Sequence, residues 1–307
     1  ETFTITVNPQ PQVVAPQNQV VCNGAQAAAI NFTGPSTGTT YVWTNNNPSI
    51  GLAASGTGNI GVFTATNPGN TPMTATITVT AQYVNGTQIC AGNSETFTIT
   101  VNPTPNVVDP ANQNLCVGNQ SLPVLFTGNV SGTTYAWTNN NPSVGLPASG
   151  TGNIASITGQ NPGQTPIVAT IAVQAQYSNA GQLCLGNTET FTITVNPQPQ
   201  VVAPQNQVVC NGAQVAAVNF TGPSTGTTYV WTNNNPSIGL AASGTGNIGV
   251  FTATNTGNTP MTATITVTAQ YVNGTQICAG NSETFTITVN PTPNVVDPAN
   301  QNLCVGN

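Results

Sequence analysis

The sequence predicts an all-β protein of tandem immunoglobulin-like (PKD-like) β-sandwich modules joined into an elongated rod. Three observations predict this fold class: apolar and polar residues alternate along several short segments, Gly, Pro and Asn separate those segments, and one unit recurs every 94 residues. Alternation with a period of two is typical of half-buried strands. Six or seven short strands in roughly 100 residues fit an immunoglobulin-like sandwich. No segment shows helical periodicity.

The repeat has two levels. Residues 1–119 recur at 189–307 with three substitutions, whereas neighbouring units of 94 residues are less alike. This pattern indicates duplication of a two-module unit. The chain is therefore an array, and an array is a way to make length.

The clearest predicted strand covers residues 73–84, MTATITVTAQYV, in which the odd positions are apolar and most even positions are threonine. Residues 95–101, ETFTITV, alternate in the same way. Asn85-Gly86 is a turn signal, so the two runs predict a long antiparallel hairpin with a loop over 85–94. Upstream, the pattern predicts strands over 28–33, 39–44 and 60–66, and a short first strand from 13–14 together with 20–21.

Module boundaries are expected at the recurring VNPxPxVV motif, since proline fixes φ and restricts the residue before it. Such linkers are short and stiff and favour a semi-rigid rod. The predicted division is residues 1–9 as the last strand of a preceding module, modules at 10–103, 104–197 and 198–291, and 292–307 as the start of a further module. The chain ends inside this pattern, so we interpret it as a window cut from a longer array, with secretion and anchoring signals outside it.

Each module carries two cysteines at a constant spacing of 68 residues. With no histidine, a zinc site is disfavoured, and no base or cation is available to activate a catalytic thiol. We therefore expect one disulfide within each module and an oxidising compartment; buried free thiols are the alternative. The predicted pairs are Cys22–Cys90, Cys116–Cys184 and Cys210–Cys278, with the partner of Cys304 outside the sequence.

The aromatic residues divide into two interpretations. We expect the Tyr-x-Trp strand of each module to fill the core, as an immunoglobulin-like sandwich buries a tryptophan. The alternative is that the tryptophans are sugar-stacking platforms, helped by the polar run Asn45–Asn47. The predicted core residues are Trp43, Trp137, Trp231, Tyr41, Tyr135 and Tyr229.

The charge content restricts function. The chain has no Lys, Arg or His and only six acidic residues, a net charge of −6. Nucleic acids and anionic membranes attract cationic proteins, so neither is an expected partner, and no stretch approaches the roughly 20 apolar residues of a membrane span. Acid–base and nucleophilic catalysis lack their usual groups, and calcium lacks clustered carboxylates. We expect no enzyme activity, no metal and no cofactor.

The sequence resembles the PKD-like, immunoglobulin-like repeats of giant surface proteins from Bacteroidota. The resemblance rests on Tyr41-Val42-Trp43, on the VCNG and LCVG motifs around Cys22 and Cys116, and on ICAGNSETFTITVNP. It covers the whole chain, although WTNNN stands where standard PKD domains have a WDFGDG-like stretch. The resemblance implies export by the type IX secretion system and display at the cell surface as long filaments, some of them SprB-type gliding adhesins.

The sequence therefore predicts the structural stalk of a secreted bacterial cell-surface adhesin or filament, with gliding motility as the finer hypothesis. The expected partners are neighbouring modules of the same chain and polysaccharide or other surfaces. Two alternatives remain open: every module binds glycan itself, or the repeats are an accessory region of a large secreted enzyme.

Overall fold

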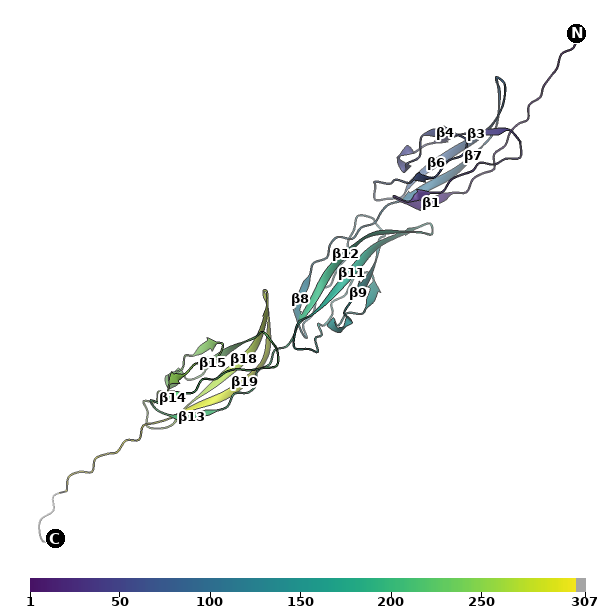
Figure 1. Ribbon diagram of the computed structural model, residues 1–307. Helices are drawn as coiled ribbons and strands as arrows, with labels where there is room; N and C mark the ends of the chain where they lie inside the picture. The colour runs from purple at the N-terminus through teal and green to yellow at the C-terminus, as the bar shows by residue number, and fades with distance from the viewer. Residues whose placement is uncertain (302–307) are drawn as a thin grey trace, which may run out of the picture.

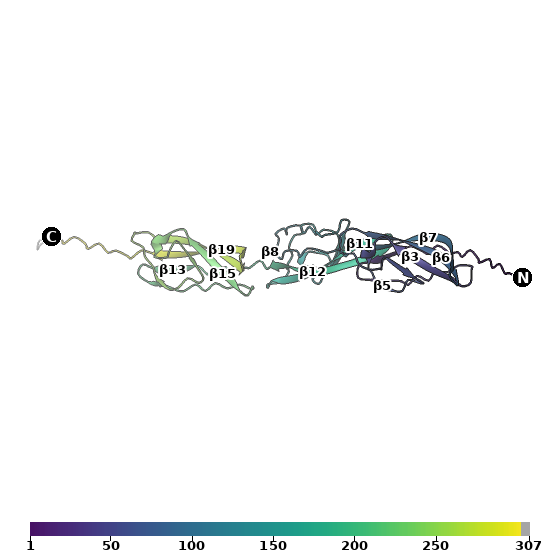
Figure 2. The same ribbon diagram turned by 90° about the horizontal axis from the view of Figure 1, so that it is seen from above.

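Three β-sandwich modules lie end to end in the computed structural model, which describes residues 1–301 (Figure 1). A view turned by 90° shows the same line of modules, so the molecule is an elongated rod (Figure 2). The predicted fold class, tandem immunoglobulin-like β-sandwich modules, is confirmed. The regular elements are strands apart from three single 3-10 turns within the described residues.

Module 1 contains one large sheet and a small second one. The large sheet has the order β1-β7-β6-β3-β4, and β1 is parallel to β7 while the other pairs are antiparallel. The small sheet pairs β2 with β5. The elements are β1 (Gln19–Cys22), β2 (Gln26–Ala27), β3 (Thr39–Asn45), η1 (Pro48–Ile50), β4 (Ser55–Thr57), β5 (Phe63–Thr64), β6 (Met73–Asn85) and β7 (Gln88–Asn102).

Modules 2 and 3 repeat this arrangement. In module 2 the small sheet is reduced to isolated bridges between residues 120 and 158 and between 124 and 154. Module 2 contains β8 (Gln113–Cys116), β9 (Thr134–Asn139), η2 (Pro142–Val144), β10 (Ser149–Thr151), β11 (Ile167–Asn179) and β12 (Gln182–Asn196). Module 3 contains β13 (Gln207–Cys210), β14 (Gln214–Val215), β15 (Thr227–Asn233), η3 (Pro236–Ile238), β16 (Ser243–Thr245), β17 (Phe251–Thr252), β18 (Met261–Asn273) and β19 (Gln276–Asn290).

The long hairpin β6–β7 is the element that the sequence predicted best. Ile77 and Val79 on its inner face are fully buried, while the alternating threonines face outward. The predicted loop over 85–94 is wrong, because β7 already begins at Gln88 and the turn is closed by Gly86 at a φ of 62°. Beyond an irregularity between Thr80 and Gln82 the hairpin leaves the core. Beyond this point the two strands stay paired through their backbones but have no buried face, so the sequence shows no hydrophobic alternation that would predict them.

Other predicted strands are shorter than expected. The run 28–33 forms only an isolated bridge, Ile30 to Ile60, and the run 60–66 contributes only the other half of that bridge and the two-residue strand β5. Residues 1–9, expected as a last strand, lie outside any strand in the described chain. A strand needs a hydrogen-bonded neighbour, and alternation alone does not supply one.

Each module has its own core. Three separate clusters of buried apolar side chains lie within residues 13–101, 107–195 and 201–289. Each cluster joins the inner face of the long hairpin to an aromatic pair such as Phe32 and Phe97, whose ring centroids are 6.4 Å apart. The modules are thus separately packed bodies, and what joins them lies outside their cores.

Candidate functional site

The three tryptophans are buried. Trp43, Trp137 and Trp231 are each 7% exposed and belong to the three core clusters. Trp43 lies directly across the ladder from Gly56 of β4, where an added Cβ would collide with the indole ring. The glycine of the Ser-Gly-Thr strand therefore makes room for the ring. A sugar-stacking platform needs an open ring face, and this packing covers it.

The tyrosines of the same strands lie at the edge of the core. Tyr135 is 9% exposed, and Tyr41 and Tyr229 are partly buried against their clusters. Tyr41 packs on Phe32 with a centroid separation of 5.6 Å. Burial raises the pKa of both Tyr135 and Tyr229, because desolvation disfavours the phenolate.

The polar run considered for glycan contact is used inside the module. The Asn45 side chain is buried and donates to the Leu52 carbonyl oxygen at 2.9 Å. The Asn46 side-chain oxygen accepts from the Thr76 amide at 2.8 Å. These amides fix the turn after β3 and its place beside β6, which leaves fewer of their groups for a ligand.

The acidic residues do not gather. Within the described residues no group of three His, Cys, Asp or Glu side chains is close enough to hold a metal ion. Glu95 instead accepts a hydrogen bond from the Asn93 side chain at 3.0 Å. The distinctive chemistry of this chain therefore lies at the junctions between modules.

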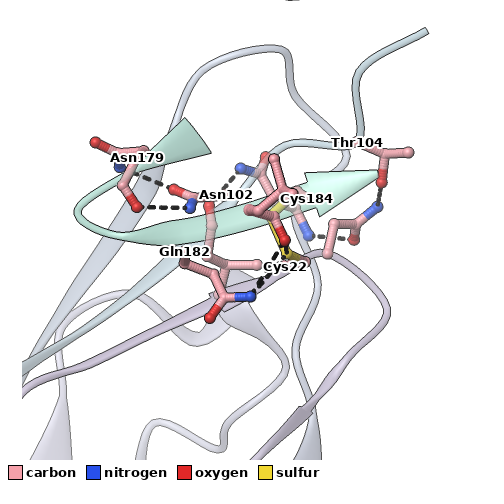
Figure 3. Close-up of a disulfide and its surroundings, with 10 residues drawn as sticks. Cys22, Asn102, Thr104, Asn179, Gln182 and Cys184 are labelled. Atoms are coloured by element: carbon pink, nitrogen blue, oxygen red, sulfur yellow. Dashed lines mark hydrogen bonds between the residues drawn. A yellow bond between two sulfur atoms is a disulfide. The ribbon is translucent and has the colours of Figure 1, made fainter. Parts of the chain in front are cut away.

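At each junction, the hairpin tip of one module reaches the end of the module before it (Figure 1). There a disulfide joins Cys22, the last residue of β1, to Cys184 of β12, with Cα atoms 5.5 Å apart (Figure 3). The next junction repeats the bond between Cys116 of β8 and Cys278 of β19. Each disulfide closes a sequence separation of 162 residues and connects two different modules.

Paired asparagines support the first disulfide. Asn102, fully buried at the end of β7, accepts from the Asn179 side chain at 2.8 Å and donates to its carbonyl oxygen at 3.4 Å (Figure 3). On the other side of the disulfide, Asn23 donates to the Thr104 hydroxyl at 3.0 Å. The junction is therefore held by covalent and polar contacts together.

The same asparagine contact recurs along the rod. Asn273 donates to the Asn196 side-chain oxygen at 2.8 Å at the second junction. Asn85, at the hairpin tip of module 1, donates to Asn8 at 2.8 Å. The segment before Pro9 therefore contacts module 1 through the same asparagine–asparagine hydrogen bond that the ends of β7 and β12 make with the modules that follow them.

A long parallel pairing runs the length of each module. We call the residues that lead into a module its entry segment (10–22, 104–116 and 198–210) and call β7, β12 and β19 the last strands. In module 1 the Val13 amide donates to Asn93, the Thr98 amide donates to Asn18, and Cys22 pairs with Asn102. Each pair is 80 residues apart, so entry segment and last strand lie side by side from one end of the module to the other.

This geometry corrects the predicted disulfides. Cys22 lies beside Asn102, whereas Cys90 lies near the start of β7, about 40 Å away at 3.3 Å per residue. A disulfide requires Cα atoms within roughly 7 Å. The intramodule pairs Cys22–Cys90, Cys116–Cys184 and Cys210–Cys278 are therefore wrong, because the two cysteines of one module lie at its opposite ends.

The remaining cysteines fit the same scheme. Cys90 and Cys210 have free thiols and occupy the positions that Cys184 and Cys22 hold in their own modules. The prediction for Cys304 lies outside the described residues. The constant spacing of cysteines in the sequence fits pairing within a module and pairing across a junction equally well, and the choice between them needed the direction of the strands.

The asparagine contacts were not predicted from the sequence. Asn102 precedes a proline in the VNP motif, which repeats at every boundary. That repetition marks the position as structural, but it does not indicate the hairpin-tip asparagine as its partner.

No protein-family model matches the chain, and no curated protein sequence matches it. Solved structures with a similar arrangement include Sidekick-1 immunoglobulin domains 1–5, at 14% identity over 92% of this chain and 59% of that chain, with a TM-score of 0.33. The I9–I11 tandem from titin matches at 12% identity over 92% of this chain and 100% of that chain, with a TM-score of 0.30. The human desmocollin-1 ectodomain matches at 15% identity over 92% of this chain and 61% of that chain, with a TM-score of 0.33. These matches support no functional conclusion.

Proposed function

We propose that this chain is the stalk region of a secreted cell-surface adhesin, a rod that holds a binding region away from the cell. The observation that carries the proposal is the pair of disulfides that connect consecutive modules, Cys22–Cys184 and Cys116–Cys278. Disulfides at the junctions hold consecutive modules together in a row. They add nothing to a pocket or to a catalytic group.

The disulfides also support an extracellular location, because such bonds persist in oxidising compartments. Within the described residues, no helix has the length and apolar character needed to cross a membrane. The surface is nearly free of charge, and its exposed threonines and asparagines keep it polar. The chain offers no lysine or arginine to trypsin-like proteases, which suits a protein exposed outside the cell.

Location is tested on intact cells that express the full gene. An antibody against residues 10–291 should label unpermeabilised cells along filaments that project from the surface, as seen by immunogold electron microscopy. The matched control is a strain from which the gene is deleted. Labelling that appears only after permeabilisation would contradict the proposal.

The stalk role is separated from repeated glycan binding by shortening the array. Deleting residues 104–291 removes one two-module unit and leaves the sequence in register. A stalk should become shorter while each molecule binds its target with unchanged affinity, whereas modules that bind glycan one by one should lose avidity. Adhesion measured as affinity per molecule, together with filament length, decides between the two.

The finer proposal, a gliding adhesin exported by type IX secretion, rests on the resemblance of the VCNG, LCVG and Tyr-x-Trp motifs. It is tested by deleting the gene in the source bacterium and measuring spreading and cell movement on a solid surface. Normal gliding in the deletion strain would reject this finer role and leave the stalk proposal in place.

A further inference from the structure

Each junction is crossed twice by covalent bonds. The first crossing is the peptide chain, which passes from the last strand of one module into the entry segment of the next. The second is the disulfide, which passes from the end of an entry segment to the start of the next last strand, as from Cys22 to Cys184. Both crossings connect segments that run the full length of their modules.

We infer that the disulfides turn the array into two continuous covalent rails that carry tension, so that the oxidised rod cannot lengthen by unfolding its modules. One rail follows the entry segment of module 1, Cys22–Cys184, β12 and the entry segment of module 3. The other follows β7, the entry segment of module 2, Cys116–Cys278 and β19. The rest of each module, residues 23–89 in module 1, hangs on the rails and bears no load.

The rails are already close to full extension. Gln12 and Gln198 are exposed residues at the two ends of the first two modules. Through Cys22–Cys184 they are joined by about 24 residues, which span about 80 Å in strand-like geometry and at most about 90 Å when stretched. Without the disulfide they are joined by the whole intervening chain, which reaches about 670 Å at 3.6 Å per residue.

The hydrogen bonds explain why both rails share the load. Entry segment and last strand are parallel neighbours in one sheet, bonded through Val13–Asn93, Asn18–Thr98 and the β1–β7 ladder. A pull on one rail therefore shears it against the other along the whole module, and many bonds resist together. The inference rests on the disulfide connectivity and goes beyond the proposed adhesin role. A negative result in the immunogold labelling of cells would therefore reject the adhesin proposal and leave this mechanical inference in place.

The test is single-molecule force extension of the complete 307-residue chain in optical tweezers, with handles attached to non-natural amino acids at Gln12 and Gln198. All molecules carry Cys90→Ser, Cys210→Ser and Cys304→Ser, so that the remaining thiols cannot exchange. The oxidised chain should lengthen by about 10 Å before rupture. After a dithiol reductant has cleaved the disulfides by exchange, the same chain should lengthen by about 590 Å.

A matched pair of variants isolates the bond responsible. The double substitution Cys22→Ser and Cys184→Ser should give the full extension without reductant. The double substitution Cys116→Ser and Cys278→Ser removes an equivalent disulfide from the same fold, yet it should leave the chain between the handles inextensible. Peptide mapping of the oxidised protein after a non-tryptic digest verifies the Cys22–Cys184 cross-link.

Three results would overturn the inference. One is module-sized lengthening of oxidised molecules in which mapping finds Cys22 bound to Cys184. Another is a cross-link between Cys22 and Cys90, which would leave the junction with a single covalent crossing. Equal extension of the two double variants would also reject it, since only one of the two disulfides lies on the short path between the handles.

Discussion

Replacing Gly92 with alanine should detach the entry segment of module 1 from β7 and destabilise that module by about 3 kcal/mol. An added Cβ at Gly92 would overlap the Pro11 carbonyl oxygen and lie 2.6 Å from its carbon. The colliding atoms are the Cβ fixed on the backbone of residue 92 and the backbone carbonyl group of Pro11, so no side-chain rotation relieves the overlap. The segment next to Pro11 must move away from the sheet.

The magnitude follows from what this movement exposes. Val13 is 4% exposed, and loss of its burial costs about 1.5–3 kcal/mol. The Val13 amide donates to the Asn93 side-chain oxygen at 2.7 Å, and the Asn93 side-chain nitrogen donates to the Val13 carbonyl oxygen at 3.1 Å. Each such bond contributes about 0.5–1.5 kcal/mol. Partial relaxation of the segment keeps the expected loss near 3 kcal/mol.

Urea unfolding measures this loss in one module, because each module has a single tryptophan. With Trp137→Phe and Trp231→Phe in every protein compared, Trp43 reports module 1 alone, and linear extrapolation gives its free energy of unfolding. The control is Gly61→Ala, where an added Cβ meets nothing within 4 Å. Its effect should stay within about 0.5 kcal/mol.

If Gly92→Ala also stays within about 0.5 kcal/mol, the entry segment is not pinned to β7 and the parallel pairing is misassigned. A thiol count distinguishes a local effect from a global one. Cys22 and Cys184 should remain bonded in the variant, since neither contacts the new methyl group directly.

Three further predictions are independent of this one. Asn139→Ala should destabilise module 2 by about 2–3 kcal/mol in a urea assay with Trp43→Phe and Trp231→Phe, in which Trp137 reports module 2. The buried Asn139 side chain donates to the Leu146 carbonyl oxygen at 2.8 Å and accepts from the Asn141 amide at 3.0 Å, and its removal leaves both backbone groups without this partner. In an ultraviolet pH titration, Tyr135 and Tyr229 should ionise at a higher pH than an exposed tyrosine, because burial raises their pKa. The raised pKa means that folding favours the neutral phenol. Their contribution to stability is therefore retained below pH about 10 and is lost as the pH rises through the raised pKa. Trypsin should leave even the reduced, urea-unfolded chain intact, because it contains no lysine or arginine, and any specific tryptic fragment would contradict the sequence.

The sequence predicted the long hairpin because its signal is local. Ile77 and Val79 alternate with threonine, and this period of two indicates a strand with one buried face whichever segments pack against it. Where a strand has no buried face, as in the hairpin beyond Gln82, the sequence predicted a loop instead. Backbone pairing there depends on the neighbouring strand, which hydrophobicity does not record.

By itself, the sequence determined that the protein is an array of β-modules with proline-containing boundaries and one tryptophan in each core. Those properties repeat every 94 residues and depend on contacts within a module. Only the tertiary structure decided which cysteines meet. Cys22 and Cys90 have the spacing of a pair, but the parallel run of entry segment and last strand places them at opposite ends of the module. The order of residues fixes how far apart two thiols are along the chain, and the direction of the strands fixes which of them come within bonding distance.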